Sequence, residues 1–306
     1  MTTPRAPKLR SVAALARGTT RAVYENQTFK IALLLAPVIL ILGVLFLGGL
    51  SIGALRSLNY SPNLGQTTPN LSAYVTLLSA PDTYWSFLLS AHIALTSTAL
   101  SALLAVASAL LLRQTFAGRA TINFLFQLNL TVPHLVGAIG ILYLFSQSGS
   151  FARLAFAAGA IDAPRDFPAL IFDPNAAGII LLYVWKEVPF IGLIVLANLQ
   201  SVGDGYEHAA RTLGATRTQT FRHVTLPLIT PSLAGACALV FAFTFGAYEI
   251  PALLGAHYPT AVPVEAYKNF TDVDLNSRPE AMALSVLIAM VSAVLVGVYL
   301  RATARR

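Results

Sequence analysis

Two carboxylates, Glu187 and Glu249, lie inside long apolar runs of the sequence. An ionisable group in membrane hydrocarbon is costly unless it faces a cavity or a partner, so such a residue is a functional candidate by default. Gly246 and Pro251 flank Glu249, and transporters often build a cation site from an interrupted helix beside a carboxylate. These residues predict a solute pathway that accepts a positive charge.

Each carboxylate also has a structural interpretation. Glu249 could lie near the outer end of its helix and face water or a partner subunit, and Glu187 could contact another helix or subunit. The neighbouring Lys186 does not simply neutralise Glu187, because adjacent side chains on a helix do not face each other. The candidate pathway therefore comprises Glu187, Glu249 and the nearby aromatic residues Trp185 and Tyr248.

No other set of residues has the spacing of a catalytic or metal site. No His, Cys, Asp or Glu residues are spaced as metal ligands, no Ser, His and Asp share one predicted face, and Cys237 is the only cysteine. His134, which follows Pro133, is predicted to be a hydrogen-bonded structural residue. The phosphate-binding pattern Gly-x-x-x-x-Gly-Lys-Ser/Thr is also absent. We therefore expect no enzyme activity, no catalytic residue, no metal and no cofactor in this chain.

The composition places these residues in a membrane protein. Of 306 residues, 56% are hydrophobic and 11% are charged, and the mean hydropathy is +0.68, whereas soluble domains carry about 25% charged residues. A membrane-spanning helix needs about 20 mostly apolar residues. Six runs meet that length: 31–50, 87–112, 121–145, 176–199, 231–254 and 281–300. They predict an all-α integral membrane protein with six transmembrane helices.

The basic residues indicate how these helices are oriented. The net charge is +7, and 14 of the 20 Lys and Arg residues lie before the first run, in the second and fourth connections, and in the C-terminal tail. Because cytoplasmic segments of membrane proteins are rich in Lys and Arg, both termini are expected to be cytoplasmic. The same distribution argues against nucleic acid as a partner. Arg10, Arg17 and Arg21 in the basic leader could contact anionic membrane lipid.

The chain is expected to divide into four parts. These are a cytoplasmic leader (1–30), a first span with its external loop (31–86), a core of five spans (87–301) and a cytoplasmic tail (302–306). Short helices are expected at 71–78 and 151–160 in the external loops. The second of these is too short to span a membrane and fits an interfacial or re-entrant helix.

The cytoplasmic connection between the fourth and fifth runs has the pattern of a helical hairpin. Asp204 and Glu207 are spaced as an N-cap residue and the acid of a capping box. Gly214 is typical of the left-handed position that ends a helix. A second helix is expected over 216–224, with Pro227 ending it, since proline disfavours helical geometry in the residue before it. A cytoplasmic hairpin with an apolar face indicates a groove on a partner protein.

This segment resembles the EAA loop of the permease subunits of binding-protein-dependent ABC importers. The family pattern is Glu-Ala-Ala, three residues, Gly, nine residues, Ile, one residue and Leu-Pro. The residues at matching positions are Ala209, Ala210, Gly214, Val224, Leu226 and Pro227. The chain departs from the pattern where His208 replaces the family's Glu, with Glu207 one position earlier, and where Val224 replaces Ile.

The resemblance implies a type I ABC importer in which this loop is the coupling helix, seated in a cleft of a separate ATPase. The residues assigned to that contact are Glu207, His208, Ala209, Ala210, Leu213, Gly214, Ala215, Val224, Leu226 and Pro227. ATP and magnesium would bind in the ATPase and not in this chain. The implied partners are two ATPase subunits, a second, non-identical permease and an extracytoplasmic solute-binding protein, in the inner membrane of a bacterium or archaeon.

Two features resemble the polyamine, ferric iron and thiamine group of this family. Sugar-type members usually carry Asp immediately before the motif glycine, where this chain has Leu213, and the stretch 246–255 also resembles that group. The resemblance implies a small cationic solute such as a polyamine. The alternatives within the family are ferric iron, thiamine or another small solute. The alternative from another class is an ion-gradient-driven secondary transporter or channel, although no inverted repeat or ion-coupling array is evident.

Overall fold

The computed structural model describes residues 27–62, 65–114 and 117–304, and these residues are mostly helical. Within these ranges no strand is present, and the only extended pairing is an isolated bridge between Ser61 and Gln66. The prediction of an all-α fold is therefore confirmed. Most of the predicted leader (1–26) and the end of the predicted tail (305–306) lie outside the described residues, as do 63–64 and 115–116.

Six helices in the described part of the chain are long and apolar enough to cross a membrane. They are Gln27–Ser57, Pro81–Arg113, His134–Ala157, Ala177–Val202, Arg217–Gly246 and Leu275–Arg301. This number confirms the six predicted spans.

The third span differs from the prediction, which placed one continuous helix at 121–145. The chain there forms two helices, α5 (Arg119–Thr131) and α6 (His134–Phe145), and apolar residues continue into α7 (Ser150–Ala157). The break lies at Pro133, because proline lacks an N–H group and disfavours helical geometry in the residue before it.

The chain divides into two compact units, residues 1–55 and 56–306. The described part of the first unit is an apolar helix that starts at Gln27, includes a π-helical stretch (Leu42–Leu47) and continues in α2 (Gly48–Ser57). Its most apolar 18 residues include no buried side chain, as expected for a helix that contacts lipid or another membrane helix. The domain limits proposed at residues 30, 86 and 301 stay predictions.

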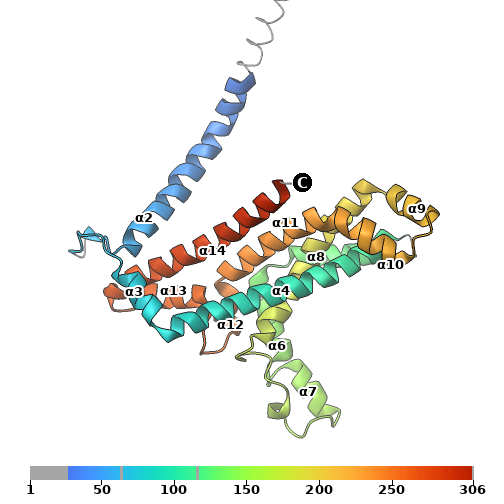
Figure 1. Cartoon of the computed structure of the whole chain (residues 1–306). Helices are drawn as coiled ribbons and strands as arrows, with labels where there is room; N and C mark the ends of the chain where they lie inside the picture. Colours follow the sequence, from blue (N-terminus) through green and yellow to red (C-terminus); the bar gives the residue numbers. More distant parts are fainter. Residues whose placement is uncertain (1–26, 63–64, 115–116, 305–306) are drawn as a thin grey trace, which may run out of the picture. The chain divides into compact units, whose positions relative to one another are not determined.

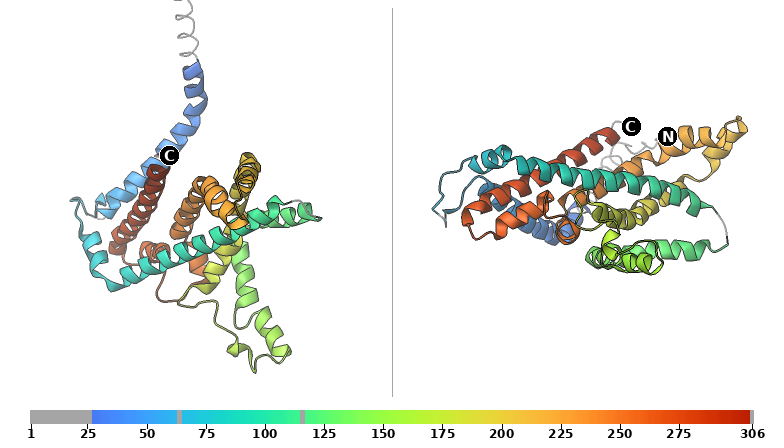
Figure 2. Two further views of the ribbon diagram at one scale, coloured as in Figure 1. Left: turned by 45° about the vertical axis from the view of Figure 1, so that its right-hand side comes forward. Right: turned by 90° about the horizontal axis from the view of Figure 1, so that it is seen from below.

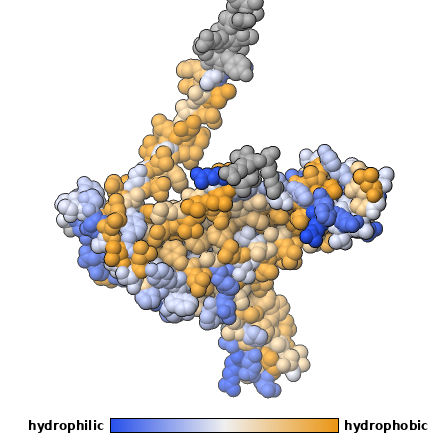
Figure 3. Space-filling view, viewed as in Figure 1, coloured by the Kyte–Doolittle hydropathy of each residue, from blue (hydrophilic) through white to orange (hydrophobic). Residues whose placement is uncertain are grey.

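Small side chains explain how the second unit packs. The buried face of α4 (Pro81–Arg113) includes Ser90, Ala94, Ser97, Ser101, Ala105 and Ala109. Small residues at this spacing let helices approach closely. Helix α4 packs mainly against α8 (Ala177–Val202) and also against α11 (Leu226–Gly246), which in turn contacts α14 (Arg278–Ala304). Figures 1 and 2 show this arrangement, and Figure 3 shows the hydrophobic surface of these spans.

Further short helices lie in the connections and at the end of the third span. The helices α3 (Ser72–Ser79) and α7 agree in position with those expected at 71–78 and 151–160. The interruption expected around Glu249 is present, because α11 ends at Gly246 and α12 (Glu249–Leu254) begins a new helix. Helix α13 (Val262–Thr271), which follows α12, was not predicted.

Candidate functional site

The segment after α8 folds into a hairpin of two short helices. Helix α9 (Gly205–Thr212) leads into a turn at Leu213 and Gly214, and α10 (Arg217–Thr220) continues through a π-helical stretch (Phe221–Thr225) into α11. Gly214 has φ +89°, the left-handed conformation predicted for the residue that ends the first helix. The predicted helix-Gly-helix arrangement is therefore confirmed, and residues 204–225 are called the hairpin below.

Two details of the predicted hairpin are wrong. The Asp204 side chain makes no cap hydrogen bond to α9, because its carboxylate is bound by Arg113, and a charged donor forms a stronger hydrogen bond than a backbone N–H. The capping box is instead at α10, where Thr216 and Gln219 bond reciprocally. Pro227 does not end the second helix, because the wider π-helical turn before it joins α10 to α11 without a break.

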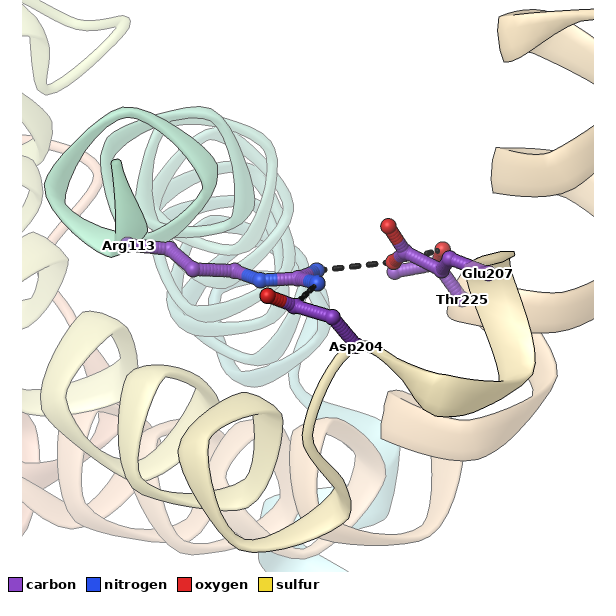
Figure 4. Close-up of polar contacts among 4 residues, drawn as sticks. All are labelled: Arg113, Asp204, Glu207 and Thr225. Carbon is purple, nitrogen blue, oxygen red and sulfur yellow. Dashed lines mark hydrogen bonds and ion pairs between the residues drawn. The ribbon is translucent and has the colours of Figure 1, made fainter. Parts of the chain in front are cut away.

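Arg113 at the end of α4 holds both acids of the hairpin (Figure 4). Its Nη1 donates to Glu207 Oε1 at 2.7 Å, and its Nη2 donates to Asp204 Oδ1. Thr225 Oγ1 also donates to Glu207 Oε1, at 2.6 Å. These four residues, called the Arg113 clamp below, tie the end of α4 to both arms of the hairpin.

The Arg113 clamp changes the acidity of its carboxyl groups. The hydrogen bond from Arg113 holds the pKa of Glu207 below its usual range, although burial opposes this shift. The pKa of Asp204 is also lowered, first by its hydrogen bond from Arg113. A carboxyl with a lowered pKa stabilises the folded state above its unfolded pKa, about 4, and this contribution is lost as the pH falls through the lowered value. The clamp is therefore expected to stay intact at neutral pH.

The tip of the hairpin is open to solvent. Leu213 is 89% exposed and Tyr206 is 63% exposed. Among the other residues assigned to the ATPase contact, the exposed ones are His208, Ala209, Gly214 and Pro227, and the half-buried ones are Glu207, Ala210, Ala215, Val224 and Leu226. The carboxylate of Glu207 is bound to Arg113. The next residue, His208, occupies the position of the family's Glu, and its side chain is open to solvent.

Glu187 lies in the buried part of α8. The residue is 6% exposed, and its Oε1 is 3.4 Å from His134 Nε2 at the start of α6. The structural contact to another helix that the sequence allowed for Glu187 is therefore present. His134 has the hydrogen-bonded structural position predicted for it.

The other predicted pathway residues lie on exposed surface. Glu249 is exposed in the first turn of α12, and Trp185 and Tyr248 are 43% and 37% exposed. The ring of Tyr248 is 4.6 Å from the ring of Tyr267, between centroids. Both carboxylates of the predicted pathway lie within electrostatic range of Tyr183, which is fully buried. Glu249 and Tyr248 are thus both exposed, and Tyr248 forms an aromatic pair with Tyr267.

Two prolines each lack the N–H that would bond the backbone carbonyl four residues earlier, and a polar side chain binds each of these two carbonyls. Pro189 in α8 cannot donate to the carbonyl of Trp185, which accepts a hydrogen bond from the Asn129 side chain. Pro133 cannot donate to the carbonyl of Asn129, which accepts from the Val132 N–H at 3.2 Å and from the Lys186 ammonium group at 2.7 Å. Lys186 also donates to a second carbonyl at the end of α5, at 2.6 Å. The lysine therefore complements the negative end of the α5 dipole.

Sequence reasoning assigned none of Arg113, Thr225, Asn129 and Lys186 to a site. Two signals could have found them. Arg113 is the basic residue that ends a long apolar run. Asn129 is four residues before Pro133, where a proline frees a carbonyl, and Lys186 adjoins the carbonyl freed by Pro189.

Comparison with known proteins shows similarity over most of the chain. Residues 98–306 match the family described as binding-protein-dependent transport system inner membrane component. The chain is 30% identical over 226 residues to the molybdenum transport system permease protein ModB of Mycobacterium tuberculosis, covering 72% of this chain and 80% of that protein. It is 28% identical over 186 residues to the sulfate transport system permease protein CysT of Salmonella typhimurium, covering 61% and 64%. It is 28% identical over 265 residues to the inner membrane ABC transporter permease protein YcjO of Escherichia coli, covering 85% and 89%.

A solved structure shares the fold. A bacterial ABC transporter involved in the import of the acidic polysaccharide alginate matches with a TM-score of 0.72 at 20% identity, covering 94% of this chain and 99% of that chain. At this identity the likeness concerns the fold alone. The names of these relatives concern molybdenum, sulfate and alginate, so they do not support the expected likeness to the polyamine group.

Proposed function

This chain belongs to the binding-protein-dependent transport system inner membrane components, the permease subunits of ABC importers, and from this premise we propose how it works. One copy forms half of the solute pathway, and a second, non-identical permease forms the other half. Two separate ATPase subunits bind ATP with magnesium, and an extracytoplasmic binding protein delivers the solute. The complex lies in the inner membrane of a bacterium or archaeon, with both termini and the hairpin on the cytoplasmic side.

The proposal that the hairpin couples the ATPase to the membrane helices rests on the attachment of the hairpin to α4. The exposed tip at Leu213 docks in a cleft of the ATPase, together with the assigned residues around it. Movement of the ATPase displaces the hairpin, and the Arg113 clamp passes this displacement to the span α4. Short hydrogen bonds to the Glu207 carboxylate, from Arg113 and Thr225, support this role, because a loosely attached loop would absorb the movement instead.

Purification of the full chain from native membranes tests this function. We expect an ATPase and a second six-span permease to co-purify with a tagged chain, because the hairpin needs the ATPase cleft as its partner. Mass spectrometry of the purified complex identifies both. A chain that purifies alone, from an extract in which other ABC complexes stay assembled, would favour the alternative of an ion-gradient-driven transporter or channel.

Two observations support different solutes. The relative named for sulfate transport favours an anion. The residues of this chain favour a small cationic solute such as a polyamine, because Glu249 offers an exposed carboxylate next in sequence to Tyr248, whose ring lies against that of Tyr267. Lys186 is not open to an anionic solute, since it is buried and backbone carbonyls hold its ammonium group. We therefore propose a cationic solute, with Glu249 and Tyr248 in the pathway and Glu187 and Trp185 nearby.

The Glu249→Gln variant tests the charge of the solute. It removes the negative charge and keeps the size of the side chain, so uptake of labelled putrescine should fall roughly tenfold if the carboxylate binds an amine. Uptake is measured in cells that express the whole importer. Asp162→Asn is the matched control, since Asp162 is another exposed acid and should have little effect. Uptake of labelled sulfate without uptake of putrescine would reject the cationic solute.

A further inference from the structure

A pocket of about 720 Å³ lies between the end of α4 and the hairpin. Its wall includes Leu110, Arg113, His208, Arg211, Arg217 and Phe221. Figure 3 shows that this end of the molecule carries strongly hydrophilic residues beside hydrophobic ones. Leu213 at the tip of the hairpin does not line the pocket, although Glu207 and His208, which are assigned to the ATPase contact, do.

The charged side chains of the pocket leave one positive charge. Arg113 is paired with Asp204 and Glu207. In the part of the chain that the structure describes, Arg211 and Arg217 have no carboxylate within 4.0 Å, and both are exposed. Three arginines and two carboxylates thus line the pocket, which has a net charge of +1 with the histidine uncharged. Arginine binds phosphate oxygens through paired N–H donors, so a phosphate group with one negative charge complements this wall.

The pocket lies where an apolar helix reaches its polar end. Leu110 on its wall is followed by Leu111, which is 64% exposed, and Arg113 ends α4. Phe221 adds apolar surface from the first turns of the fifth span. The headgroups of a bilayer lie just outside its hydrocarbon core. The pocket therefore combines apolar side chains with arginines at the polar end of α4.

We propose that this pocket binds the phosphodiester headgroup of an anionic phospholipid, with Arg211 and Arg217 holding the phosphate. The proposal rests on the membrane orientation proposed above, which places the hairpin beside the cytoplasmic leaflet. A lipid uses both parts of the pocket, since its glycerol and upper acyl chains contact Leu110 and Phe221. A free phosphate ion would leave that apolar surface unused. The bound lipid bridges α4 and the hairpin beside the Arg113 clamp.

Native mass spectrometry of the full chain, purified in mild detergent, tests this site with added phospholipids. We expect the chain to retain about tenfold more phosphatidylglycerol than phosphatidylcholine, because only the former carries a net negative charge. Each arginine that binds the phosphate is expected to contribute about fivefold to the affinity for anionic lipid. The Arg211→Gln/Arg217→Gln variant should therefore bind phosphatidylglycerol roughly 20-fold more weakly.

Two control variants separate the site from general charge and from misfolding. Arg222→Gln is the matched control, because Arg222 is exposed on the same hairpin and does not line the pocket, and its lipid binding should stay within about twofold of wild type. The Arg211→Lys/Arg217→Lys variant keeps the charge and should retain most of the binding. Inorganic phosphate at millimolar concentration should not displace the lipid.

Equal retention of phosphatidylglycerol by the wild type and the double glutamine variant would overturn the proposal. Displacement by inorganic phosphate would also overturn it and would indicate a site for a soluble anion. A double glutamine variant that loses its ATPase but keeps its lipid would place both arginines in the ATPase contact instead. Because lipid retention is measured on this chain alone, the lipid site and the ATPase coupling can fail separately.

Discussion

The Gly214→Val variant is expected to lose at least about tenfold in ATP-driven uptake while its membrane helices stay folded. Gly214 has φ +89°, which glycine adopts freely and a β-branched residue does not. A Cβ at this position would meet no atom within 4 Å, so the effect comes from the backbone and not from a clash. The turn must rearrange, and the tip at Leu213 then no longer fits the ATPase cleft. Solute uptake and the amount of folded chain in the membrane measure the effect.

Gly205→Val is the matched control for this experiment. Gly205 lies in the same hairpin and has open space around its Cβ position, but its φ is not positive. This variant should keep more than about half of wild-type uptake, as surface substitutions away from special backbone positions usually do. Full uptake by Gly214→Val would remove the hairpin from the coupling proposal. Equal loss in both variants would show that the turn conformation is not the cause.

The hairpin could be predicted because its signals are local. Gly214 adopts a left-handed backbone conformation that few other residues adopt, and this conformation ends a helix. The position of Gly214 in the sequence therefore sets where α9 ends. The same holds for the spans, whose length and composition identify them without knowledge of their neighbours. The effect of proline is also local. The sequence therefore predicted the interruption around Glu249, and the same signal is present at Pro133, where the prediction missed the break.

The contacts of the hairpin could not be predicted because they are distant in sequence. Arg113 is 91 residues from Asp204 and 94 residues from Glu207, and the packing of α4 on α8 brings them together. Asp204 does occupy the N-cap position of α9, but the side-chain cap hydrogen bond expected of it is absent for this reason, since a local pattern does not include a competing arginine from another helix. Lys186 is a similar case, because its partners are carbonyls of α5 that become available only when two broken helices pack together.

Charge reversal at Arg113 is expected to uncouple ATP hydrolysis from uptake. Arg113→Glu places three carboxylates together and removes the hydrogen bond to Glu207, and hydrogen bonds to charged groups contribute about 1.5–3 kcal/mol each. Because the side chains of Arg113 and Glu207 are only 17% and 18% exposed, water does not fully replace this contact. Uptake should fall at least about tenfold while the ATPases continue to hydrolyse ATP. Both rates are measured in the same proteoliposomes that contain the complete importer.

A second substitution separates the ion pair from other effects of charge reversal. The Arg113→Glu/Glu207→Arg variant forms the pair in the opposite direction, and Asp204, three residues before position 207, can also bind the new arginine. Rescue should be partial, to roughly threefold below wild type, because Thr225 loses the carboxylate that it now binds at 2.6 Å. Arg119→Glu makes the same charge change in α5 and should transport normally. The reversed pair could restore assembly with the ATPase without restoring uptake. That outcome would show that Arg113 is needed for a contact other than the clamp, and the proposed route from the hairpin to α4 would be wrong.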